Sequence, residues 1–270
     1  MPSPKEKLAA SLEILQALQQ GGRVAIRSRD LSRTHRERLV QNGFLREVMK
    51  GWYIPAHPQE TLGDSTAWYT SFWAFCAGYL ASRFGAAWSL SPEQSLMLHI
   101  GNRTVPRQLL VRATKGRNHI LALPYGTSLL DVKANLPEPG EQDEMEGLRL
   151  FSLPAALVEA GPAFFERHPT DARTALAMLR DASAILEKLL NGGHSFIAGR
   201  LAGGLRDIGR GRKACAGRYG EKKSFTRISL VGQGDTPLAV VLEIFGFDAE
   251  RHRRFGGSER AEMDQEQAQG

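Results

Sequence analysis

Residues 27–55 read RSRDLSRTHRERLVQNGFLREVMKGWYIP, a basic segment followed by two short apolar runs. Ser32 and Thr34 are residue types that cap the N-termini of helices, and Thr34 with Glu37 forms a capping-box pattern. The dipeptide Asn42–Gly43 tolerates the left-handed conformation in which many helices end. The segment therefore predicts a helix that starts near residue 32 or 34 and stops at this dipeptide.

The residues around this helix predict a small module. FLREVM (44–49) and WYIP (52–55) are typical of two strands, and Lys50–Gly51 between them is a tight hairpin signal. Upstream, Lys5–Gln20 carries a helical stripe of apolar residues and is followed by a short run with alternating apolar residues. The order helix, short strand, helix, hairpin is that of a winged helix-turn-helix, which we predict for residues 1–58.

Basic residues are concentrated in this module. Arg23–Lys50 contains eight Lys or Arg residues against three acids, in a chain whose net charge is +6. A basic helix of this kind suits the major groove of DNA, where Arg pairs with guanine and Thr contacts thymine methyl groups. The predicted base-contacting residues are Arg33, Thr34, Arg36 and Arg38. The predicted phosphate-contacting residues are Arg27, Arg29, Arg46 and Lys50. The alternative is an ordinary surface helix with a solvated basic face.

The rest of the chain predicts a mixed α/β domain over residues 60–212 and a divergent, partly disordered tail over 213–270. The helical patterns lie at 64–85, 91–99, 154–165, 171–193 and 194–210, and the later ones form a C-terminal helical layer. The strand patterns lie at 108–113, 119–124, 128–136 and 148–153, with an acidic Pro/Gly loop at 137–147. The predicted fold class is α+β.

Composition narrows the classes of protein. Cys76 and Cys215 are the only cysteines, which excludes a disulfide framework and a cysteine zinc site and favours the reducing cytoplasm. The uncharged stretch 65–82 approaches the length of a membrane span, but its five Ser and Thr residues favour a buried core helix. We therefore predict a cytoplasmic protein that makes no membrane contact.

A second basic patch follows within residues 101–118, which contain no acid. Its members are Arg103, Arg107, Arg112, Lys115 and Arg117. A third lies at 200–213. Each patch either extends a phosphate-binding surface or faces the acidic loop at 138–146; the sequence leaves both interpretations open.

Motifs for catalysis or cofactor binding are missing. Asp131-Val132-Lys133 matches the acid-x-Lys element of metal-dependent nucleases, but no further acid occurs between Glu93 and Asp131. The seven histidines are scattered, and no Walker loop, GxGxxG motif or GxSxG elbow occurs. We predict no catalytic residue, no metal and no cofactor.

Several segments together carry a family resemblance. They are DLSRTHRERLVQNGFLREVMKGWYIP (30–55), STAWYTSFWAF (65–75), LSPEQSLMLHIGNRTVPRQLLVRA (90–113), LPYGTSLLDVK (123–133), GLRLFSLPAALV (147–158) and HSFIAGRLAGGLRDIGR (194–210). Residues 27–212 resemble the N-terminal half of a group of bacterial Fic-family proteins. The order of elements also resembles the AbiEi-type antitoxins of toxin–antitoxin systems, a winged helix followed by a mixed α/β domain. The resemblance stops near Lys213.

The catalytic half of Fic proteins transfers a nucleotide monophosphate, usually AMP, to a protein hydroxyl through an HPFxxGNGR loop. This sequence lacks that loop, because His99–Arg103 supplies only a GNR without the Pro-Phe that should follow the histidine. The inhibitory helix motif of the family also fails: Ser183–Glu187 has the spacing, but Lys188 stands where Gly or Asn is expected. The resemblance therefore implies a relative without the family's active site.

These observations together predict a DNA-binding regulator, either an antitoxin-like autorepressor or an accessory subunit of a Fic-type system. The predicted partners are double-stranded DNA, a toxin or Fic-domain protein, and a second copy of the chain. One alternative is a Fic-type nucleotidyl transferase that a partner chain completes. Another is a protein-interaction module that does not bind DNA.

Overall fold

A computed structural model describes residues 3–59 and 63–179, together with single positions between 185 and 204. The chain divides into two compact units, one of Met1–Ser95 with Arg103–Ser152, the other of Leu96–Asn102 with Leu153–Gly270. Helices occur together with antiparallel and mixed sheets, so the fold class is α+β, as predicted. The predicted domain limits of 1–58, 60–212 and 213–270 stay predictions.

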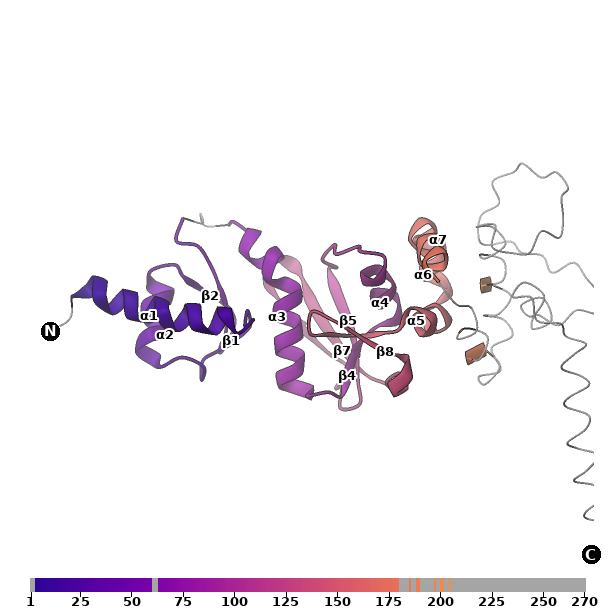
Figure 1. The fold of residues 1–270 in the computed structure, drawn as a ribbon, viewed down its shortest axis with the longest axis horizontal. Coiled ribbons are helices and arrows are strands. Elements are labelled where there is room, and N and C mark those ends of the chain that lie inside the picture. The colour runs from indigo at the N-terminus through magenta and orange to yellow at the C-terminus, as the bar shows by residue number, and fades with distance from the viewer. Residues whose placement is uncertain are drawn as a thin grey trace, which may run out of the picture. The chain divides into compact units, whose positions relative to one another are not determined.

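The first unit begins with a small module, residues 3–55, which we call the N-terminal module (Figure 1). Its elements are α1 (Pro4–Gln20), β1 (Ile26–Arg27), α2 (Arg33–Gln41), β2 (Leu45–Met49) and β3 (Trp52–Pro55). The strands form an antiparallel sheet in the order β1-β3-β2. A turn at residues 28–30 and a bend at residue 31 connect β1 to α2.

Helix α2 begins and ends through local chemistry. The Ser32 hydroxyl accepts a hydrogen bond from the His35 amide at 3.3 Å, so Ser32 is the N-cap. The Thr34–Glu37 capping box was the wrong alternative, because Thr34 already lies inside the helix. At the other end Gly43 has a φ of +76°, a conformation that glycine adopts at no steric cost, and the chain reverses there as predicted.

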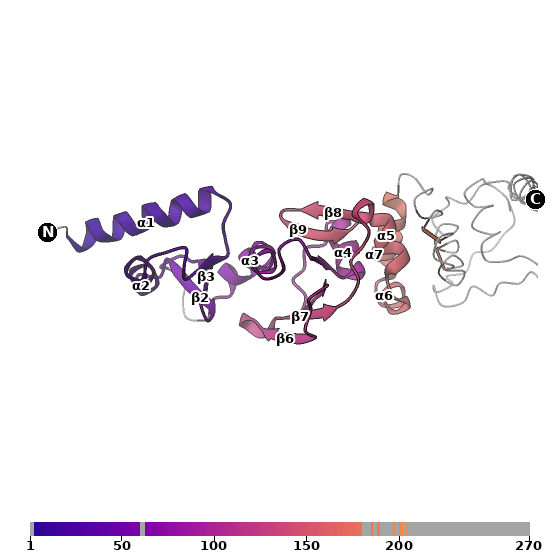
Figure 2. The same ribbon diagram turned by 90° about the horizontal axis from the view of Figure 1, so that it is seen from below.

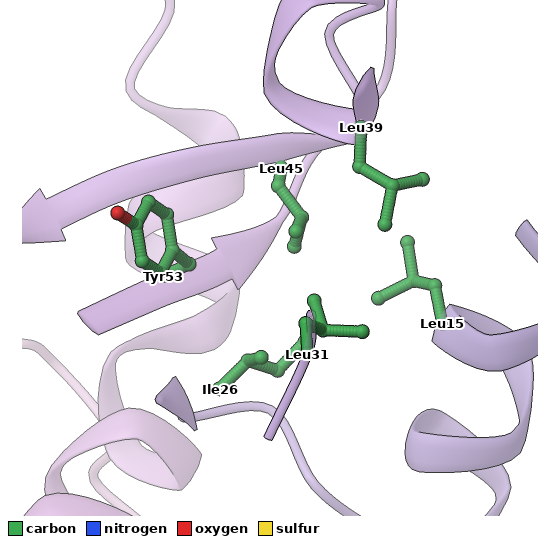
Figure 3. Packing of buried hydrophobic residues seen from close by; sticks show 6 residues of the cluster. All are labelled: Leu15, Ile26, Leu31, Leu39, Leu45 and Tyr53. Carbon is green, nitrogen blue, oxygen red and sulfur yellow. The ribbon is translucent and has the colours of Figure 1, made fainter. Parts of the chain in front are cut away.

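The core of the N-terminal module is a cluster of buried side chains from all of its elements. Its members are Leu15, Ile26, Leu31, Leu39, Leu45 and Tyr53, all at most 9% exposed. Figure 3 shows Leu15 of α1 and Leu39 of α2 pointing toward one another above Leu31. Burying each such side chain stabilises the fold by about 1.5–3 kcal/mol. This apolar contact determines which face of α2 is turned away from solvent.

Helix α3 (Thr66–Phe84) is a core helix, as predicted from the uncharged stretch 65–82. In Figure 1 it stands between the N-terminal sheet and the second sheet of the unit. Trp52 of β3 lies edge-on to Phe75 and Tyr79 of α3, with ring centroids 6.0 and 5.2 Å apart. None of the described helices is long and apolar enough to span a membrane.

The second sheet contains β4 (Trp88–Leu90), β5 (Gln108–Ala113), β6 (His119–Ala122) and β7 (Ser128–Lys133). Its order is β4-β5-β7-β6; β5 and β7 are parallel, and the other pairs are antiparallel. β8 (Gln142–Met145) and β9 (Leu148–Phe151) form a separate two-stranded antiparallel sheet, which Figure 2 shows.

Two of these strands contradict the sequence-based assignment. The connection between the predicted helices at 64–85 and 91–99 contains β4, and the predicted acidic loop contains β8 and a 3-10 turn at Pro139–Glu141. β4 has only three residues, and β8 reads QDEM, which lacks the apolar alternation of a half-buried strand. Both form because a partner strand, β5 or β9, supplies the backbone hydrogen bonds.

Helix α4 (Pro92–His99) begins as predicted, because the Ser91 hydroxyl accepts from the Gln94 amide at 3.2 Å. The second unit continues with α5 (Leu153–Glu159), α6 (Pro162–Arg167) and α7 (Pro169–Met178). The predicted helical patterns beyond residue 179, the basic patch at 200–213 and the tail lie largely outside the described residues.

Candidate nucleic-acid interface

The solvent-facing side of α2 is polar except for Val40 and carries Arg33, one of the three arginines predicted to contact bases. We call its exposed residues, Arg33, Thr34, Glu37, Val40 and Gln41, the outer face of α2. The Arg33 side chain is 83% exposed, and its Nε lies 2.6 Å from Glu37 Oε1, one turn along the helix. An exposed ion pair of this kind contributes little to stability, so Arg33 is able to exchange Glu37 for another anion.

Arg36 and Arg38 do not lie on the outer face, although both were predicted to contact bases. Arg36 Nη1 donates to the Ser28 carbonyl at 3.0 Å, and Arg38 Nη1 donates to the Lys7 carbonyl and the Ser11 hydroxyl, each at 2.8 Å. Both side chains are half-buried. These arginines fasten α2 to the preceding turn and to α1.

A polar contact between α1 and α2 was not predicted from the sequence. Ser11 is fully buried, donates to the Lys7 carbonyl at 2.9 Å and lies 2.9 Å from His35 Nδ1. Together with Arg38 it joins the two helices beside the apolar core. Ser11 precedes buried Leu15 by one helical turn, and that spacing was the one available sign that it faces inward.

Arg27, predicted to contact phosphate, is used inside the protein. Its guanidinium Nη2 lies 3.3 Å from Asp30 Oδ1, its amide donates to Asp30 Oδ2 at 2.8 Å, and Nη1 donates to Ser82 at 3.0 Å. Burial acts to raise the pKa of Asp30, but the hydrogen bonds from Arg27 outweigh it, so this pKa lies below the usual value. Asp30 therefore holds the turn from which α2 starts.

The lowered pKa of Asp30 predicts a loss of stability on acidification. The charged carboxylate stabilises the folded state above the unfolded pKa of about 3.9, and this contribution disappears as pH falls through the lower folded pKa. We expect Asp30→Ala to lower the free energy of unfolding at pH 7 by about 1.5–3 kcal/mol, with a smaller difference from wild type near pH 2.5. Urea titrations at both pH values measure it. A difference that stays constant between them would contradict this role.

The remaining predicted phosphate contacts fall into two groups. Arg46 Nη1 donates to the Asp64 carbonyl at 2.8 Å and to the Tyr125 hydroxyl at 3.1 Å, so Arg46 links β2 to a later part of the unit. Arg29 and Lys50 are exposed, and their side chains have no partner among the described residues. Only the second group is available to a ligand without breaking an internal contact.

The available cations come from adjacent segments. The Ser28 amide donates to the Gly51 carbonyl at 2.9 Å, which places the turn that carries Arg29 next to the hairpin tip that carries Lys50. The same turn leads into the first residue of α2, Arg33. The N-terminus of a helix carries a partial positive charge and unpaired amide groups that favour anions. Three exposed basic side chains thus come from the start of α2 and from two segments that meet just before it.

In the second predicted basic patch, some arginines contact other parts of the protein and other basic side chains do not. Arg103 forms a two-pronged ion pair with Glu146, with both N–O distances 2.7 Å, and the Arg112 guanidinium lies 5.0 Å from the centre of the Phe151 ring. Glu146 follows the β8 strand, so for Arg103 the observed contact is the one with the acidic loop. Arg103, Arg107, Lys115 and Arg117 are exposed, and of these Arg103 is the one with a side-chain ion pair among the described residues.

Asp131, the acid of the acid-x-Lys element, forms a structural ion pair with Arg83. Asp131 has no exposed surface; its Oδ2 lies 2.6 Å from Arg83 Nη2, and its Oδ1 accepts from the Arg117 amide at 2.6 Å. Lys133 is exposed and does not share this contact. Within residues 3–59 and 63–179, no group of three or more His, Cys, Asp or Glu side chains is arranged to hold a metal ion.

Comparisons with known proteins add no assignment. Searches of protein-family models, of curated proteins and of solved structures found no match to this chain. The resemblance to Fic-family proteins and to AbiEi-type antitoxins therefore stays a prediction.

Proposed function

We propose that the N-terminal module is a winged helix-turn-helix that binds double-stranded DNA, with the outer face of α2 in the major groove. The observation that carries this proposal is that Arg29, Arg33 and Lys50 are exposed and come from the start of α2 and from the turn and hairpin tip that meet just before it. In helix-turn-helix proteins, the N-terminal residues of the recognition helix contact the base edges. Arg33 and Thr34 occupy those positions here.

A recognition helix must be held in a fixed orientation. Arg36 bonds α2 to the preceding turn, and Arg38 bonds it to α1. The β2–β3 hairpin lies beside the turn at Ser28 and acts as the wing, with Lys50 at its tip on a phosphate. Arg33 reads a base edge once it has left Glu37.

The regulatory role and the partners rest on the family resemblance. We propose an antitoxin-like autorepressor or an accessory subunit, in the cytoplasm, that acts with a toxin or Fic-domain protein and binds DNA as a homodimer. Enzymatic activity is not part of the proposal, because the sequence lacks the HPFxxGNGR loop that the family's chemistry needs.

Fluorescence anisotropy with labelled duplex DNA from upstream of the protein's own coding sequence tests DNA binding. We expect Arg33→Ala with Thr34→Ala to weaken binding to the preferred sequence by about 10–100-fold and to affect other sequences less, because base contacts carry the specificity. Arg29→Ala with Lys50→Ala should weaken binding to all sequences and flatten the slope of log affinity against log salt by about 2 per protomer.

Arg167→Ala is the matched control, because Arg167 is an exposed arginine at the end of α6 in the other unit. It should leave affinity and salt slope unchanged. Circular dichroism checks that each variant is folded. Binding that does not depend on salt, or that survives all four substitutions at 29, 33, 34 and 50, would refute DNA binding through this surface. Retention of a toxin by such a protein would instead favour the interaction module.

A further inference from the structure

A hollow on the first unit lies outside the N-terminal module and is lined by two tyrosine rings and an arginine. Its lining residues are Tyr69, Val105, Arg107, Tyr125, Gly126 and Thr127. Tyr69 comes from α3, whereas Tyr125 comes from the 3-10 turn η1 (Pro124–Gly126) that precedes β7. Arg107 carries a positive charge and none of the other lining residues carries a negative one, so the hollow favours an anionic ligand.

Tyr125 is held in an unusual conformation. Its φ of 54° and ψ of 37° lie in the left-handed region, which bulky side chains seldom adopt. The Tyr125 hydroxyl donates to the Asp64 carbonyl at 2.6 Å and accepts from Arg46 Nη1 at 3.1 Å. Strained residues that their surroundings hold in place are concentrated at functional sites. Here the two hydrogen bonds of the hydroxyl hold the Tyr125 ring beside the hollow.

The two rings are exposed and lie close together. Tyr69 is 42% exposed and Tyr125 is 41% exposed; their centroids are 6.3 Å apart, with a tilt of 35°. Every other Phe, Tyr or Trp side chain within the described ranges is less exposed than these two. Exposed aromatic rings beside a basic side chain form the stacking platform that proteins use for unpaired bases.

Arg107 supplies the charge. Its side chain is exposed and has no partner among the described residues, while its carbonyl accepts from the Ser128 amide at 2.9 Å and so fixes the backbone. The Thr127 hydroxyl, by contrast, is already used: it donates to the Pro124 carbonyl at 2.7 Å and accepts from Trp68 Nε1 at 3.1 Å. Arg107 is therefore the polar group of the hollow that an anionic ligand meets first.

We propose that this hollow binds a nucleoside monophosphate unit, with its base on the tyrosine rings and its phosphate on Arg107. The same chemistry comes from two sources, a free nucleotide or an unpaired nucleotide in a single strand. Paired bases in a duplex do not present their faces, so this site is separate from the proposed duplex-binding surface and does not rest on it.

Isothermal titration calorimetry of the full chain with AMP, adenosine and inorganic phosphate tests the proposal. AMP should bind about 10-fold more tightly than adenosine, because only AMP carries the group that Arg107 recognises. In Arg107→Gln the two affinities should become equal. Tyr69→Ala should weaken AMP and adenosine alike by about 5–50-fold, whereas Tyr69→Phe should keep the stacking and the affinity.

Tyr125→Gly removes the second ring and also relieves the left-handed strain, so it should weaken binding without unfolding the protein. Arg167→Gln is the charge-matched control and should bind AMP like wild type. Titration with a single-stranded oligonucleotide of ten nucleotides distinguishes the two sources of the ligand. Binding tighter than that of AMP indicates that the hollow takes a nucleotide of a single strand. Weaker binding indicates that it takes a free nucleotide. No binding of AMP or of the strand, or equal affinities in wild type, Arg107→Gln and Tyr69→Ala, would overturn the proposal.

Discussion

Asp131→Ala should lower the free energy of unfolding by about 3–5 kcal/mol, because removing one partner of a buried ion pair leaves the other uncompensated. Asp131 is completely buried on β7, and its carboxylate holds two groups at once. It pairs with Arg83 at 2.6 Å and accepts from the amide of Arg117 at 2.6 Å. The substitution therefore removes the ion-pair partner of Arg83 and the acceptor of the Arg117 N–H. Urea denaturation followed by circular dichroism measures the change.

Arg83→Ala tests the same pair from the other side. It removes the partner that is 24% exposed and leaves the fully buried carboxylate, so it should destabilise the fold at least as much as Asp131→Ala. Glu144→Ala is the control: Glu144 is an exposed acid on β8, and its replacement should change stability by less than about 0.5 kcal/mol. If Asp131→Ala were as mild as Glu144→Ala, the structural role of Asp131 would be wrong.

Gly116→Ala should lower the free energy of unfolding by about 3 kcal/mol, at the upper end of the range for overpacking. A Cβ at Gly116 would lie 2.5 Å from the Val132 carbonyl carbon and 2.6 Å from both the Val132 oxygen and the Lys133 nitrogen. All three are backbone atoms of β7, so a rotamer change relieves none of the contacts. The β5–β6 connection or β7 itself must shift. Thermal or urea denaturation shows the loss.

Gly140→Ala is the matched control for that substitution. A Cβ at Gly140 meets nothing within 4 Å, and its φ is not positive. Alanine there should be neutral or should stabilise the protein by about 0.4–1 kcal/mol, because it restricts the unfolded chain. Equal stabilities of the two variants would show that the close approach of Gly116 to β7 does not constrain the fold.

The sequence by itself determined the elements that depend on local chemistry. Helix α2 could be bounded from Ser32 and Gly43, because a cap and a left-handed glycine act within one turn of the chain. The core role of α3 followed from the uncharged, aromatic-rich stretch 65–82. The concentration of positive charge between Arg23 and Lys50 was equally visible, since it is a property of composition.

The tertiary structure alone decided which basic side chains are available. Arg38 donates to Ser11, 27 residues away, and Arg46 to Tyr125, 79 residues away, so both are used in contacts that no local pattern contains. The short strands β4 and β8 likewise depend on partners supplied by other segments. Hydrophobic periodicity reports the face of an element, whereas the hydrogen-bond partner of a long polar side chain depends on what folding brings beside it. For that reason the charge of the N-terminal module was predictable, and the meeting of the turn that carries Arg29 with the hairpin tip that carries Lys50 was not.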